Sequence, residues 1–264
     1  MTLFLRELKA NRKAFIIWAV CIVLLVLTGM GKYSAYSKGS DSIAIFNDLP
    51  HTVKALFGMS SFDVTTISGY FAMLFLYIEI TVCIHAALLG AGILSKEERD
   101  KTSEFLMVKP ITRGSVVTSK LVAAALNVLL INIITWVSSV SIVSIYNKGE
   151  SINNELSWFF VSMLFVQFIY LSFGLFLSTL LTKPKSAGTI AVNGMLVGYI
   201  ISRVTDITDQ LNVLNLLSPF KYFSYVAIVK GVGLQPVAIL CSLLLIVILL
   251  IGTYILYEKR ELRA

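Results

Sequence analysis

Long apolar runs, separated by short polar stretches, constrain the fold of this chain more than any other feature of its sequence. A membrane-spanning helix needs about 20 mainly apolar residues, because each residue advances about 1.5 Å across a hydrocarbon core of about 30 Å. Runs of that approximate length cover residues 14–33, 67–94, 116–145, 158–181, 186–202 and 236–257. None of the five prolines lies in the middle of a run, where it would interrupt helical hydrogen bonding.

The composition agrees with these runs. The chain is 57% hydrophobic and only 14% charged, and its mean hydropathy is +0.83. We therefore expect an all-α polytopic membrane protein in which six transmembrane helices form one transmembrane domain over residues 1–264. In a soluble protein the net charge of +7 would suggest a nucleic-acid partner. Here the excess of Lys and Arg in cytoplasmic loops explains the charge, so we expect no nucleic acid.

The distribution of positive charge predicts the orientation. Of the 22 Lys and Arg, 15 fall in the N-terminal segment, residues 95–120, the turn at 182–185 and the C-terminal tail. The richer side is predicted to be cytoplasmic, which places both termini and the polar stretch after the second run in the cytoplasm. Frequent Lys, Ile and Asn favour a low-GC bacterium and hence a bacterial plasma membrane.

Two further segments are predicted to be helical without crossing the membrane. In residues 3–13, Arg6, Lys9 and Lys13 fall on one side of a helix, which favours an interfacial amphipathic helix with its cations toward anionic head groups. The alternative is a charged flank of the first span. Residues 205–235 are apolar but are split by Pro219, and each half is too short to cross. We expect an external re-entrant or interfacial helical hairpin there.

A polar stretch at residues 95–113 lies between the second and third runs. Ser95 and Glu98 fit a capping box at a helix start, and Pro110 would end that helix after about three turns. So short a helix is marginal unless it docks on something. Its charged first half and its apolar second half, residues 105–108, favour a lever resting on a partner protein. An ordinary solvated loop is the alternative.

With these features the whole chain resembles, in layout, the permease subunits of ABC-2-type ATP-binding-cassette transporters. The basic segment at 4–9, Ser218-Pro219-Phe220 and the tail at 257–260 match, and the most specific match is the loop with its acidic pair, Thr-x-Glu and later Pro and Arg. Lys101 stands where the family often has Gly, which is a mild departure.

The resemblance implies a mechanism. In that family the loop forms a cytoplasmic coupling helix in a groove of a separate ATPase, and closure of two ATPase subunits moves two permeases, identical or homologous, between inward and outward arrangements. The residues carried over to this contact are Glu97, Glu98, Thr102, Glu104, Leu106 and Arg113. The chain is not expected to be an enzyme or to hold a cofactor, because its only Gly-Lys pair, Gly31-Lys32, lacks the rest of a P-loop. ATP and Mg would be bound by the partner.

Polar residues inside the runs are candidates for a substrate path: Glu79, Gln167 and Asn193. An ionised carboxylate at the centre of a span costs about 2.5–3.5 kcal/mol, so Glu79 should be protonated, paired or exposed to a wet cavity. Hydrogen bonding between helices is the alternative role for all three. The three cysteines and two histidines show no metal-ligand spacing, so we expect no metal site.

Other function classes fit less well. An intramembrane protease would need its acidic pair and histidine inside the membrane, whereas Glu97 and Glu98 lie in a charged loop. A stand-alone channel or secondary transporter would be expected to show inverted repeats with broken helices, which the sequence lacks. Nothing resembles a docking site for an extracellular binding protein, so export is favoured. Spans with little charge favour a hydrophobic or antimicrobial peptide or a lipid-like cargo.

Overall fold

The computed structural model describes residues 3–34, 50–56, 62–99, 112–147, 152–181, 183 and 186–260. Every regular element in these ranges is helical, and six of the helices are long and apolar enough to cross a membrane. These are α1 (Leu3–Gly31), α5 (Ile67–Arg99), α7 (Arg113–Tyr146), α8 (Asn153–Leu180), α9 (Ala187–Thr205) and α11 (Pro236–Lys259). The predicted all-α fold with six spanning helices is confirmed.

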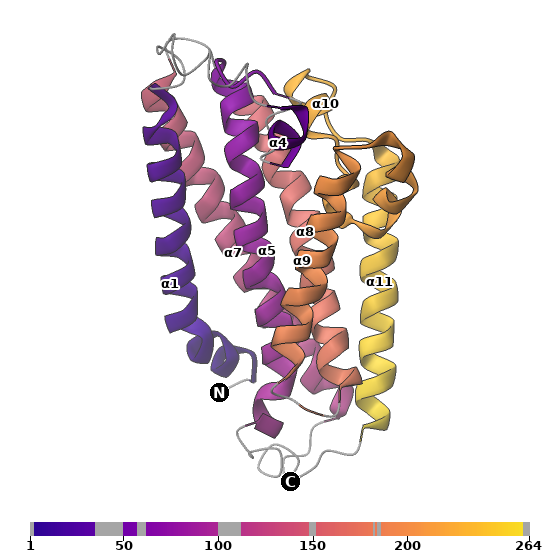
Figure 1. Cartoon of the computed structure of the whole chain (residues 1–264). Helices are drawn as coiled ribbons and strands as arrows, with labels where there is room; N and C mark the ends of the chain where they lie inside the picture. The colour runs from indigo at the N-terminus through magenta and orange to yellow at the C-terminus, as the bar shows by residue number, and fades with distance from the viewer. Residues whose placement is uncertain are drawn as a thin grey trace.

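The six helices form an elongated bundle, and the start of α1 and the end of α11 lie at the same end (Figure 1). We call this the terminal end. The short helices α4 (His51–Leu56) and α10 (Tyr225–Val229) lie at the opposite end, which we call the far end. The side of the membrane that each end faces remains a prediction.

Helices α5 and α8 form the centre of the bundle. In the most apolar 18-residue stretch of each, 67% is buried inside the bundle, whereas in α11 the corresponding value is 11%. Two glycines allow this close packing, because a Cβ at Gly90 would lie 2.2 Å from the carbonyl oxygen of Leu171 and one at Gly174 would lie 2.4 Å from that of Ala87. Small residues permit such backbone approach between membrane helices. Most of α11 is exposed on the outside of the bundle.

The first turns of α1, which the sequence predicts to be an interfacial helix, continue into the spanning part and bend toward the bundle (Figure 1). Glu7 in these turns is buried and pairs with the buried Lys120 of α7 at 3.6 Å. Lys120 also donates to the carbonyl oxygen of Ile93 in α5. This pair fixes the start of α1 to two other helices. Contact of residues 3–13 with head groups remains a prediction.

The stretch at 205–235, for which the sequence predicts a helical hairpin, forms three short helices. The 3-10 helices η2 (Asp209–Leu217) and η3 (Pro219–Lys221) precede α10. Ser218 donates to the carbonyl oxygen of Gly198 at 2.7 Å, which holds the segment against the end of α9. Its membrane depth remains a prediction, but its packing brings polar residues of η3 and α10 over the far ends of α5 and α9.

Candidate functional site

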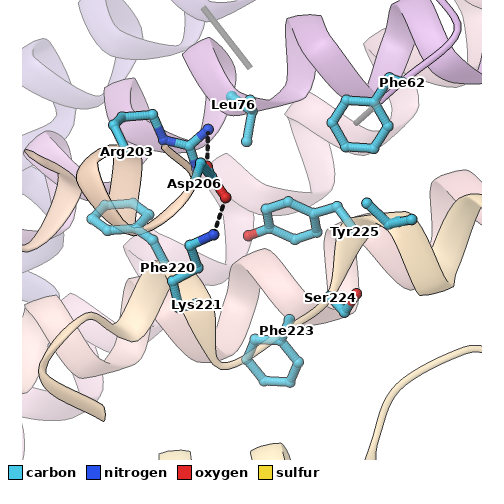
Figure 2. A pocket seen from close by; sticks show the side chains of 10 residues that line it. Phe62, Leu76, Arg203, Asp206, Phe220, Lys221, Phe223, Ser224 and Tyr225 are labelled. Atoms are coloured by element: carbon cyan, nitrogen blue, oxygen red, sulfur yellow. Dashed lines mark hydrogen bonds and ion pairs between the residues drawn. The ribbon is translucent and has the colours of Figure 1, made fainter. Parts of the chain in front are cut away.

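A cavity of about 230 Å³ lies where the far ends of α5 and α9 meet residues 219–226, and we call it the far-end cavity (Figure 2). Its volume is below the range of about 300–1,000 Å³ that is usual for small-molecule sites, so it would hold part of a larger molecule. Its walls combine aromatic and charged side chains. They are formed by Phe62, Leu76, Arg203, Asp206, Phe220, Lys221, Phe223, Ser224, Tyr225 and Val226.

One carboxylate in this cavity is shared by two cations. Asp206 pairs with Arg203 at 3.0 Å and with Lys221 (Figure 2). Arg203 is buried, and its Nη2 donates to the hydroxyl of Ser202 at 2.8 Å. Its Nε has no hydrogen-bond partner in the described part of the chain. The wall therefore holds a buried donor that could serve the polar group of a ligand.

Tyr225 connects the cavity wall to Glu79 in the middle of α5. The Tyr225 hydroxyl donates to the Glu79 carboxyl group, and both side chains are buried. Burial raises the pKa of the Tyr225 phenol well above its ordinary value, so the hydroxyl remains protonated and keeps its role as donor. The rings of Phe75 and Phe159 pack against the Tyr225 ring, with centroid distances of 5.3 and 5.7 Å. Glu79 thus lies behind the wall of the cavity.

The other two predicted substrate-path residues lie elsewhere. Gln167 of α8 is buried and accepts a hydrogen bond from Asn132 of α7 at 3.0 Å. Asn193 of α9 is exposed. The structure therefore does not bring Glu79, Gln167 and Asn193 together at one site, and for Gln167 the contact matches the alternative of hydrogen bonding between helices. A role in a substrate path remains a prediction for all three.

At the terminal end, Arg260 joins three helices around the start of the predicted coupling loop. Directly after α11, its Nη2 binds Glu98 of α5 at 2.7 Å and donates to the carbonyl oxygen of Leu181 at 3.0 Å. Its Nη1 donates to the carbonyl oxygen of Ser178. A cation at the last carbonyls of α8 is favoured, because the C-terminal end of a helix carries partial negative charge.

Arg113 makes the corresponding contact at the other end of the loop. It is the first residue of α7 and donates to the carbonyl oxygens of Glu258 at 2.8 Å and Arg260 at 2.6 Å. Thr112 caps the helix by accepting from the amide of Ser115 at 3.3 Å. Both flanks of residues 100–111 are therefore held against the end of α11.

The remaining predicted coupling residues are described only in part. The predicted helix start at Ser95 is wrong, because α5 continues through it to Arg99 and the Ser95 hydroxyl donates to the carbonyl oxygen of Ala91 at 2.6 Å. Glu97 therefore lies in the last turn of α5, but its side chain is outside the described residues. Thr102, Glu104 and Leu106 are also outside them. The structure thus describes how Glu98 and Arg113 frame the loop, and the contact of the loop with an ATPase remains a prediction.

Comparison with known families gives a match over nearly the whole length. The sequence profile of the family described as "ABC-2 family transporter protein" covers residues 1–262. The chain belongs to the ABC-2 transporter family. It is thus a multi-pass membrane component of an ABC transporter, of a kind that is generally not catalytic. No curated protein matches the chain.

Sequence reasoning about this ABC-2 protein missed several polar contacts. It treated Lys120 as a loop cation, although the lysine falls inside the run at 116–145 and is fully buried against Glu7. A lysine within an apolar run is itself a signal that a partner exists. The role of Arg260 has no comparable signal, because Glu98, Ser178 and Leu181 are distant from it in sequence and two of its contacts are to main-chain carbonyls. The pair of Arg203 and Asp206 was also missed, although its i,i+3 spacing on a helix is a signal for such a contact.

Proposed function

We propose that the chain is the permease subunit of an ABC-2-type exporter, that it forms the substrate path and that it couples to a separate ATPase. The match to the family over residues 1–262 carries this proposal. The framing of residues 100–111 by Glu98 and Arg113 supports it, because a loop held at both flanks can pass a push from a docked ATPase to α5 and α7. In this proposal the terminal end faces the cytoplasm of a bacterium.

The proposed assembly has two ATPase subunits and two permeases, the second being a copy of this chain or a homologue. Glu97, Thr102, Glu104 and Leu106 would contact the ATPase, while ATP and Mg would be bound by that partner alone. Glu98 would act mainly through its ion pair with Arg260.

The proposed cargo is a hydrophobic or antimicrobial peptide or a lipid-like compound. The far-end cavity supports an amphipathic cargo, since Phe62, Phe220 and Phe223 lie beside the charged group of Arg203, Asp206 and Lys221. The cavity is too small for a whole peptide, so it would hold one polar group together with nearby apolar atoms.

Co-purification of this chain with a candidate ATPase encoded by a neighbouring gene tests the proposal. The unmodified chain should yield a stable complex of two ATPases and two permeases by mass measurement. The double variant Glu97→Lys and Glu104→Lys should insert normally but lose most of the bound ATPase, because charge fixes the register of such contacts. The control Glu258→Lys reverses an exposed charge at the same end and should retain the ATPase. Full ATPase retention by the double variant would contradict the proposed contact.

Glu98→Lys is a separate arm, because it breaks the internal pair with Arg260. It should lower the stability of the permease whether or not the ATPase is present. If no ATPase binds the unmodified chain, the coupling role fails irrespective of the variants.

A further inference from the structure

A second hollow lies between α1 and α5 toward the terminal end. It has a volume of about 310 Å³, and we call it the α1–α5 crevice. One end is lined by Ala10 of α1 and Lys96 of α5, and the other by Trp18 and His85. Since His85 and Lys96 are 11 positions apart on α5, the crevice extends about 16 Å along that helix. This is an elongated groove rather than a round pocket.

The middle of the groove is apolar. Ala14, Leu88 and Gly92 form part of its middle, and Leu88 is 40% exposed. A Cβ at Gly92 would meet no atom within 4 Å, so the middle is open. At the inner end the rings of Trp18 and His85 meet edge to face, with centroids 5.4 Å apart. An apolar chain fits such a surface better than a polar ligand does.

The mouth of the groove has one lining cation, Lys96. Lys9, Arg12 and Lys13 are exposed on the neighbouring turns of α1 without lining the groove, so they add positive charge near its mouth. The described acidic side chains near this end of the two helices do not offset these cations. Glu7 is buried against Lys120, and Glu98 is paired with Arg260. The mouth therefore favours an anionic group, as basic pockets between membrane helices do.

We propose that the α1–α5 crevice binds one anionic phospholipid of the leaflet at the terminal end. Its phosphate lies at Lys96, near the cations of the first turns of α1, and one acyl chain lies along Ala14, Leu88 and Gly92. The complementarity of a basic mouth and an apolar groove open to the bilayer supports a lipid over a soluble anion, which would leave the groove unfilled. This inference concerns the permease itself and does not depend on the cargo or on the ATPase.

Native mass spectrometry of the purified full chain tests the site, with phosphatidylglycerol and phosphatidylcholine offered in turn. Phosphatidylglycerol should be retained as one tightly held molecule, and phosphatidylcholine much less. Gly92→Leu should abolish retention by filling the groove, whereas Gly114→Leu, also at a glycine with open space, should not. Lys96→Gln should weaken retention about fivefold, since one cation near an anionic surface contributes on that scale. The exposed Lys230 at the far end gives the matched control, Lys230→Gln.

Equal retention of the two lipids would overturn the proposal, as would unchanged retention of phosphatidylglycerol by Gly92→Leu. Equal losses in Gly92→Leu and Gly114→Leu would also overturn it. A bound molecule that is not a phospholipid, together with exclusion of phosphatidylglycerol, would assign the crevice to cargo instead. Lys96→Gln adds no volume to the bundle, so its selective effect decides the matter even if Gly92→Leu folds poorly.

Discussion

The two ends of this ABC-2 permease use charged side chains in different ways. At the terminal end, Arg260 and Arg113 bind mainly main-chain carbonyls, which are fixed parts of helix ends. At the far end, Arg203 and Lys221 bind the side chain of Asp206 beside a cavity. Carbonyls at helix ends cannot move without moving the helices, whereas side chains can exchange partners. The terminal end is therefore built as a frame, and the far end as a site that can rearrange.

Helix α5 joins the two ends. It carries Glu79, which accepts from Tyr225, and Glu98, which pairs with Arg260. The 19 positions between these glutamates correspond to about 28 Å along the helix. Because α5 packs closely on α8 through Gly90 and Gly174, we expect it to move as a rigid rod. In the proposed mechanism, a push at the predicted coupling loop would then reach the cavity wall.

Loss of Arg260 should have the largest effect. Arg260→Ala leaves Glu98 and two carbonyl oxygens without their donor, and removing one member of a largely buried pair costs about 3 kcal/mol or more. Thermal unfolding of the purified chain in detergent measures the change. Lys259→Ala, at the exposed neighbouring residue, should stay within about 0.5 kcal/mol. Equal shifts in the two variants would show that the contacts of Arg260 do not hold the helix ends together.

The contact between α5 and α8 should come next. In Gly174→Ala the new methyl group would approach Ala87 O at 2.4 Å and Ala91 N at 2.7 Å, so the helices must separate. Overpacking of this kind costs about 1–3 kcal/mol. Gly92→Ala places the same methyl group in open space and should be neutral or slightly stabilising. The unfolding midpoint distinguishes the two, and an unshifted Gly174→Ala would show that α5 and α8 are not tightly joined.

The hydrogen bond between Tyr225 and Glu79 should contribute less to stability than the contact between α5 and α8 does. Tyr225→Phe removes one buried donor and should cost about 1–2 kcal/mol. Glu79→Gln keeps an acceptor for Tyr225 and should cost less. If the two residues act as one unit, the double variant should lose less stability than the sum of the single variants. Additive losses in this double-mutant cycle would separate Glu79 from the cavity wall.

The sequence was sufficient to predict the all-α class and the number of spanning helices, but it predicted much less of the candidate site. Apolar run length determines the number of spanning helices, because a bilayer imposes that length on each span independently. No comparable requirement determines which spans contact one another. Gly194 and Gly198 form the conspicuous small-residue pair in the sequence, yet in the structure they pack on Phe173 and Tyr170 of α8. Close backbone approach between α5 and α8 is instead permitted by Gly90 and Gly174, which lie on different helices and so form no local motif.

The smallest predicted effect concerns the turn that precedes α5 and carries Phe62 into the far-end cavity. The side chain of Asp63 accepts from the hydroxyl of Thr65 at 2.6 Å and from its amide at 3.0 Å, and these bonds lower the pKa of the carboxyl group. The stabilisation is therefore present above the unfolded-state pKa of about 3.9 and is lost as the pH falls through the lower folded-state value. Because Asp63 is exposed, solvent screening should keep it below about 1 kcal/mol.

Unfolding midpoints at pH 6 and pH 3 test this turn. Asp63→Ala should be less stable than the unmodified chain at pH 6, and the difference should shrink at pH 3. Asp63→Asn keeps an oxygen acceptor but no charge, so it separates the hydrogen bonds from ionisation and should remove only the pH dependence. A difference between Asp63→Ala and the unmodified chain that is the same at both pH values would show that the turn owes nothing to the charge of Asp63. In that case Phe62 would be held in the cavity wall by packing alone.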